Sequence, residues 1–111
     1  LNILAEARTA ALVQRHDHWD ATLLPAKDVF QMITKGSKDW VAWDLDDIRM
    51  FPRGRSNNRH LANLVFNGAR CLDMWVDGNP VRMDGTTNTV DEKLAFEQLD
   101  LSVASYYDGI E

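Results

Sequence analysis

The sequence contains very little cysteine and no long apolar run. Cys71 is the single cysteine among 111 residues, so no internal disulfide can form and we expect a reducing, cytoplasmic setting. No stretch approaches the ~20 apolar residues of a membrane-spanning helix, so we expect no membrane partner. No charged and then apolar leader opens the chain, which predicts no signal peptide, and the start at Leu1 in place of Met indicates a trimmed beginning.

The composition is otherwise ordinary for a soluble globular protein. Hydrophobic residues make up 45% of the chain and charged residues 26%, and there are only three prolines. The length suits a single domain over residues 1–111, which can bury a core without a disulfide or a metal. We therefore predict one small soluble domain with no cofactor.

Sequence motifs that mark common active sites are also absent. The chain has no G-x-S-x-G nucleophile turn, no G-x-G-x-x-G dinucleotide loop and no G-x-x-x-x-G-K-[ST] phosphate loop. Cys71 has no adjacent His and no C-x-x-C partner, which favours a packed thiol over a nucleophile. We therefore name no catalytic residue and expect a non-catalytic protein.

An H-x-H-x-D spacing runs from His16 to Asp20. Binuclear metallohydrolases use such a spacing to hold Zn²⁺ through imidazoles and a carboxylate. Their pattern continues with another His, whereas Ala21 stands at that place here, and His60 is the one other histidine in the chain. Nothing is carried over from those enzymes. His16, His18 and Asp20 are a candidate for weak metal binding, and the alternative is a polar helix end.

Charge is unevenly distributed along the chain, whose formal net charge is −5. Five of the twelve Lys and Arg residues, and none of the seventeen acidic residues, lie between Ile48 and Leu72. These arginines follow aspartates at positions 39, 44, 46 and 47. They can pair with those aspartates or bind an external anion. The five are Arg49, Arg53, Arg55, Arg59 and Arg70.

The anion-binding hypothesis uses four of these arginines, which lie near the start of a predicted helix. Helix N-termini attract anions, and the guanidinium group suits phosphate. The acidic net charge repels nucleic acid at long range, so nucleic acid is a disfavoured partner. Internal pairing with the aspartates is the more economical interpretation. The candidate anion-binding residues are Arg49, Arg53, Arg55 and Arg59.

Periodicity and capping residues predict two helices in the first third of the chain. The helix over residues 2–16 is rich in Ala and Leu, and three small alanines indicate close packing. We place its end near His16, because Asp17 and Asp20 are unfavourable at the negative end of a helix dipole. The second helix, over residues 25–35, begins at Pro25 and is capped by Gly36.

The middle of the chain is predicted to form strands and one helix. Residues 40–51 are predicted as strand with a bulge or turn near residues 46–47, because apolar side chains alternate up to Leu45 and again from Ile48 to Met50. A helix over residues 57–66 follows, capped by Ser56 or Asn57.

A hairpin is predicted after that helix. Residues 70–76 alternate as a strand, and Asp77-Gly78 favours a tight turn into a return strand at residues 81–83. Pro80 has no N–H to donate, so it indicates an edge position for the return strand.

The final helix, predicted to run to about residue 106, has two apolar sides. Thr89 and Glu92 form a predicted capping box at its start. Val90, Leu94 and Leu101 share one side. A larger set of four apolar residues, listed below, lies nearly opposite. The helix either lies between the sheet and the first helix or presents its second side to a partner. With Trp75 of the hairpin, the candidate interface residues are Phe96, Leu99, Val103 and Tyr106.

The element order α-α-β-β-α-β-β-α predicts an α+β domain with a small antiparallel sheet, built from two hairpin-like strand pairs and packed with about four helices. The alternative is an all-α fold. We hypothesise a small non-catalytic cytoplasmic binding or accessory protein that docks an unknown protein partner or forms a homodimer. The alternative is a nucleic-acid or phosphate-binding protein that uses the loop from Arg53 to Arg59.

Overall fold

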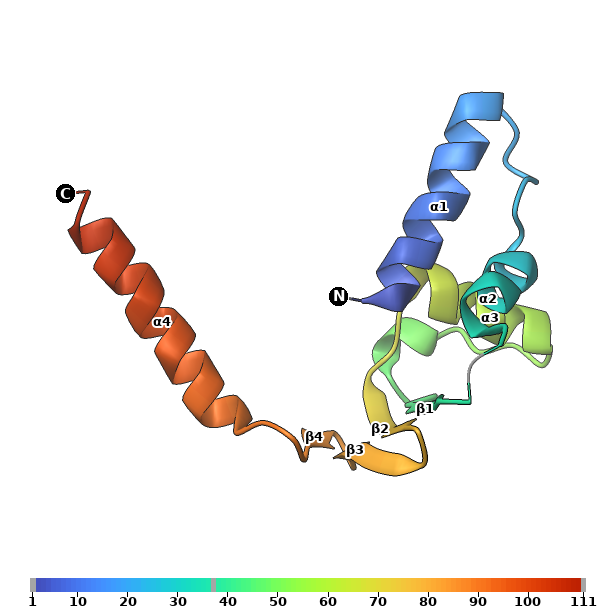
Figure 1. The fold of residues 1–111 in the computed structure, drawn as a ribbon. Coiled ribbons are helices and arrows are strands. Elements are labelled where there is room, and N and C mark those ends of the chain that lie inside the picture. Colours follow the sequence, from blue (N-terminus) through green and yellow to red (C-terminus); the bar gives the residue numbers. More distant parts are fainter. Residues whose placement is uncertain (1, 37, 111) are drawn as a thin grey trace.

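The protein is a mixed α+β structure in the computed structural model, which describes residues 2–36 and 38–110 (Figure 1). Leu1, Ser37 and Glu111 lie outside the described residues. Four helices and a four-stranded antiparallel sheet follow in nearly the predicted order. The elements are α1 (Ile3–His18), α2 (Ala26–Thr34), β1 (Trp40–Trp43), the 3₁₀ helix η1 (Ile48–Met50), α3 (Asn57–Asn67), β2 (Cys71–Val76), β3 (Asn79–Met83), β4 (Thr86–Thr87) and α4 (Glu92–Asp108).

The core lies among α1, α2 and α3. Ala7 and Ala11 of α1 are buried against Ala26 and Val29 of α2 and Val65 of α3, so the alanines allow the close helix packing that the sequence predicts. A second cluster joins α1, η1 and α3, and its buried members are Leu4, Met50, Leu64 and Ala69. We call α1 to β4 the body of the protein.

The strands follow one another in a single sheet of order β1-β2-β3-β4. Trp40 of β1 pairs with Trp75 of β2, and Val76 pairs with Asn79 across the hairpin. Asp77 and Gly78 both have positive φ, 51° and 77°, as the predicted tight hairpin requires. This confirms the hairpin and the antiparallel sheet, and the all-α alternative does not hold. The return strand is not an edge strand, because β3 also pairs with β4 through residues 82–83, beyond Pro80.

The sheet is less covered than expected. No strand residue is fully buried among those described, and Trp43 at the end of β1 is the strand residue that packs against the second core cluster. The sheet therefore adjoins the helices at one end, and most of its surface is not enclosed by helices.

The prediction that the chain returns to a strand at residues 48–50 is wrong. Residues 48–50 form η1, and β4 is instead the fourth strand of the sheet. The Asp47 carboxylate caps η1 by accepting from the Arg49 N–H at 2.9 Å. Buried Asn63 of α3 donates to the Met50 carbonyl at 2.7 Å and to the Pro52 carbonyl at 3.1 Å, which holds this segment against α3 in place of a strand partner.

Two helix ends also differ from their predictions. Helix α1 continues to His18 and is closed by Trp19 with φ of 52°, since Arg15, His16 and His18 in the last turn suit the negative helix end. Helix α4 is capped by Asp91, which accepts from the Leu94 N–H at 3.1 Å, and not by Thr89.

Helix α4 is separate from the body, and it is not enclosed between the sheet and α1 (Figure 1). No residue of α4 is buried. The Cα radius of gyration is 17.7 Å, whereas a compact domain of this length has about 13 Å. The described chain therefore consists of a packed body and a projecting helical arm.

Candidate functional site: the α4 arm and the β1 groove

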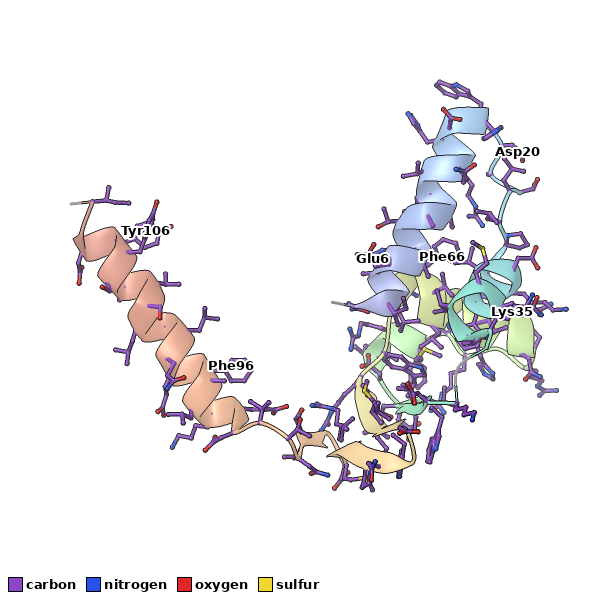
Figure 2. All side chains as sticks on the ribbon, in the orientation of Figure 1. Glu6, Asp20, Lys35, Phe66, Phe96 and Tyr106 are labelled. Atoms are coloured by element: carbon purple, nitrogen blue, oxygen red, sulfur yellow. The ribbon has the colours of Figure 1, made fainter. Side chains whose placement is uncertain are left out.

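One side of α4 carries a continuous apolar stripe. The spacings of three, four and three residues place these side chains along one helix face. Their exposed fractions are between 46% and 66%, and Phe96 and Tyr106 project from the same side of the helix in Figure 2. We call the following set the α4 stripe: Phe96, Leu99, Val103 and Tyr106.

The opposite side of α4 is apolar as well. Leu94 is 50% exposed and Leu101 is 70% exposed, and neither belongs to a core cluster. A helix with apolar residues on two sides is typical of one that is covered on both sides. The described part of the chain supplies neither cover.

A polar joint holds the start of α4 to the sheet. Glu92 accepts from Arg82 of β3 at 2.9 Å and from the Thr87 hydroxyl of β4. The Thr87 hydroxyl, together with Arg82, lowers the pKa of Glu92 below its ordinary value. Arg82 also donates to the Cys71 carbonyl at 3.1 Å, so the joint reaches β2. This role of Glu92 was not predicted, because its spacing from Thr89 favoured a capping box.

An apolar groove of about 380 Å³ lies between β1 and the helices. The strand side is made by β1 and the residue before it, and the helix side is made by the start of α1 and the end of α2. The groove was not predicted from the sequence, although the uncharged run of residues 40–43 was a signal. Its lining residues are Ile3, Leu4, Phe30, Ile33, Thr34, Asp39, Trp40, Val41 and Trp43.

Trp75, the remaining candidate interface residue, is half-buried. Its ring stacks on that of Trp40 across the β1–β2 pair, with centroids 3.6 Å apart and an interplanar angle of 9°. Trp40 is itself 52% exposed. Trp75 therefore packs on Trp40, a residue that lines the groove, and it lies apart from the α4 stripe.

The arginine segment is partly paired with its own aspartates. Arg49 makes a bidentate contact with Asp47. Its Nε donates to Oδ1 at 2.9 Å, and its Nη2 donates to Oδ2 at 2.7 Å. Arg53 pairs with Asp46 at 2.7 Å. This is the internal pairing that the sequence favoured, and it occupies two of the four candidate anion-binding residues.

Asp47 links η1 to the start of β2. Its carboxylate accepts from the Arg49 side chain and backbone and also from the Arg70 N–H at 2.9 Å. The Arg49 hydrogen bonds hold the pKa of Asp47 well below its ordinary value. The side chain is only 10% exposed, so this carboxylate acts as a structural junction.

Arg55 and Arg59 lie on the exposed surface, and no acidic side chain pairs with either among the described residues. Arg59 packs over Gly54 so closely that a Cβ added to this glycine would lie 3.1 Å from the Arg59 Cγ. Anion binding through these two arginines stays a prediction.

The three candidate metal ligands do not converge. His16 packs against Trp19, and His18 Nδ1 lies 3.0 Å from the Gln14 carbonyl. Asp20 accepts from the Thr22 hydroxyl at 2.6 Å, and this bond lowers the pKa of Asp20. Among the described residues, no group of three or more His, Cys, Asp or Glu side chains is placed to hold a metal ion.

Cys71 is a partly buried thiol at the start of β2. Its Sγ lies 3.7 Å from the Asp73 carbonyl. Burial raises the pKa of Cys71, which disfavours the reactive thiolate. No helix over residues 2–36 and 38–110 is both long and apolar enough to cross a membrane.

Comparison with known proteins gives one partial similarity. No family model and no solved structure matches the chain. The chain is 30% identical over 118 residues to a 5-methylthioadenosine/S-adenosylhomocysteine deaminase of Desulforudis audaxviator (strain MP104C). The match covers 88% of this chain but 26% of that protein, so the chain spans about a quarter of the relative's length.

Proposed function

We propose that this chain is a non-catalytic accessory protein that docks a protein partner through α4. The observation that carries this proposal is the α4 stripe, whose four members are 46% to 66% exposed on a helix with no buried residue. Most of the stability of a helix in a protein comes from the packing of its apolar face, so a partner that covers the stripe would also stabilise α4.

The partial similarity supports a particular kind of partner. In the deaminase, a similar stretch occupies 26% of a much longer chain, so most of that protein lies outside the match. Both apolar sides of α4 need a cover, and a pairing of two stripes in a homodimer would leave Leu94 and Leu101 exposed. We therefore propose a larger polypeptide that resembles the rest of such a deaminase, with this chain in a supporting role.

A binding experiment tests the docking role. The probe is a polypeptide that comprises the part of the Desulforudis deaminase outside the matched stretch. We expect a complex by light scattering, and Leu99→Asp or Val103→Asp should weaken it at least about tenfold, because a charge is placed at the centre of the apolar contact. Circular dichroism should show both variants folded, since the stripe is not part of the core.

Ala104→Asp is the matched control. Ala104 is exposed and lies between the two apolar sides of α4, so this variant adds the same charge and should bind within about twofold of the unmodified chain. Equal binding by Leu99→Asp and Ala104→Asp would contradict docking through the stripe. If the chain alone forms a dimer that Leu99→Asp dissociates, the partner is a second copy.

The cytoplasmic setting belongs to the same proposal. It is supported by the single, partly buried thiol of Cys71, which needs no oxidising compartment.

Phosphate or nucleic-acid binding is the second candidate, favoured by the exposed Arg55 and Arg59. Arg53 already holds Asp46, which leaves fewer cations for an external anion. This candidate requires salt-dependent binding to a phosphate-bearing probe that is lost when all three arginines become Ala. Absence of binding at low salt would exclude it.

A further inference from the structure

The two edges of the sheet differ in how they are protected. Proteins usually guard an edge strand with charges, proline or a very short strand, because its free N–H and C=O groups can pair with another chain. The β4 edge consists of two polar residues, Thr86 and Thr87. The β1 edge consists of four uncharged residues, Trp40 to Trp43, with no proline.

The outer edge of β1 has no backbone partner in the described part of the chain. β1 pairs with β2 alone, and no loop backbone hydrogen bond reaches residues 40–43. The apolar groove is lined by the same strand, with Val41 and Trp43 on the strand side and Phe30 and Ile33 on the helix side. An unpaired backbone edge and an apolar groove therefore occur together.

One end of the groove adjoins a segment that carries two lysines. Thr34 and Asp39 both line the groove, and the segment that joins them carries Lys35 and Lys38. Both lysines are exposed, and neither has an acidic partner among the described ion pairs. Asp39 is engaged differently, since its Oδ1 accepts from the Asp77 N–H at 2.8 Å.

We propose that β1 and the groove accept an extended apolar strand of the protein partner, with an acidic residue of that strand beside Lys35 and Lys38. Backbone hydrogen bonds to the β1 edge would supply affinity, and alternate side chains would enter the groove. This inference rests on the proposed docking function and adds a second contact, separate from the α4 stripe.

The geometry favours a strand over the other occupants of such a groove. A helix satisfies its own backbone groups and would leave the β1 edge unpaired. A small apolar molecule would fill the groove but would also leave the edge groups without partners. An added strand satisfies both features at once.

A peptide pair tests the backbone contact on the whole chain. The probe has about six alternating threonine and valine residues, the usual length of a strand, with a glutamate at each end. The matched peptide carries N-methyl groups on its threonines and its valines, so it keeps the side chains but loses the backbone donors on both edges of the strand. We expect saturable binding of the first peptide and at least about tenfold weaker binding of the second.

Hydrogen exchange locates the binding without any substitution in the protein. Of the amides of residues 40–43, the alternate ones that point away from β2 should gain protection when the first peptide is bound, whereas those of Thr86 and Thr87 should not. Val41→Lys should weaken binding at least about tenfold by guarding the edge. Thr86→Lys, which adds the same charge at the opposite edge, should bind within about twofold of the unmodified chain.

A peptide of opposite end charge tests the role of Lys35 and Lys38. A peptide with lysine at each end should bind several-fold more weakly than the glutamate peptide at low salt, and the difference should shrink at high salt. Equal affinity of the methylated and unmethylated peptides would overturn the proposal, as would binding without protection of residues 40–43 or no binding of the first peptide.

The outcome is separable from that of the docking experiment. Leu99→Asp should bind the peptide as tightly as the unmodified chain, because the α4 stripe does not line the groove. If stripe variants leave association with the larger polypeptide unchanged, the α4 proposal fails while the peptide result still decides the strand site. If the peptide result is negative, the strand site fails while α4 docking is still decided by its own variants.

Discussion

The body and the α4 arm both carry many apolar side chains but dispose of them differently. In the body, α1, α2 and α3 bury small and medium side chains such as Ala11, Val29 and Val65 against one another. In the arm, bulkier side chains such as Phe96 and Leu99 remain exposed. Stability is therefore concentrated in the body, whereas the surface available for association is concentrated in the arm.

The largest contrast is expected between core and arm truncations. Met50 is 1% exposed, and Met50→Ala should lower the free energy of unfolding by about 2–5 kcal/mol. Leu101 is 70% exposed, and Leu101→Ala should change it by less than about 0.5 kcal/mol. Urea unfolding followed by circular dichroism measures both. A large loss of stability for Leu101→Ala would mean that the arm packs against the body in solution.

Local sequence signals predicted much of the body. Three correct predictions each depend on a few neighbouring residues. They are the Asp77-Gly78 turn, the Ser56 cap of α3 and the Gly36 position after α2. Residues 48–50 were mispredicted because alternation there competes with a non-local contact, the bonds from Asn63 to the backbone of residues 50 and 52.

The candidate sites were only partly visible in the sequence. The α4 stripe follows from helical spacing alone, so it was found. Whether anything covers the stripe depends on the path of the chain after β4, which no local pattern specifies. The groove needs α1, α2 and β1 to meet, and these segments are far apart in sequence, so its residues were missed.

Two carboxylates each join neighbouring elements, Asp47 in the body and Glu92 at the start of the arm. We expect Asp47 to contribute more to the free energy of unfolding. Asp47 is 10% exposed and joins η1 to β2, so Asp47→Asn should destabilise the body at neutral pH. Because the folded-state pKa of Asp47 is depressed, its contribution is present above the unfolded pKa and is lost as pH falls through the folded pKa. The stability difference between the unmodified chain and Asp47→Asn should therefore narrow below about pH 4.

The measurement is urea unfolding at a series of pH values. A difference that stays constant from neutral to acidic pH would show that the Asp47 charge is not what holds the junction. Asp46→Asn is the matched control, since the Asp46 side chain is 81% exposed and its pair with Arg53 lies at the surface.

The smallest expected effect concerns the joint of the arm. Glu92 is 37% exposed and binds Arg82 and Thr87, so Glu92→Gln should leave global unfolding nearly unchanged. Hydrogen exchange in the first turn of α4 should nevertheless become faster, because a local opening there needs no disruption of the core. The folded-state pKa of Glu92 is depressed, so exchange at that turn should depend on pH. Protection of the turn is present above the unfolded pKa of Glu92 and is lost as pH falls through its folded pKa.

The control is Glu97→Gln, which alters a weaker surface pair with Lys93 at 3.9 Å on the same helix. It should not change exchange at that turn. If both substitutions act alike, the loss of helix charge explains the result, and the joint with β3 and β4 does not anchor the arm.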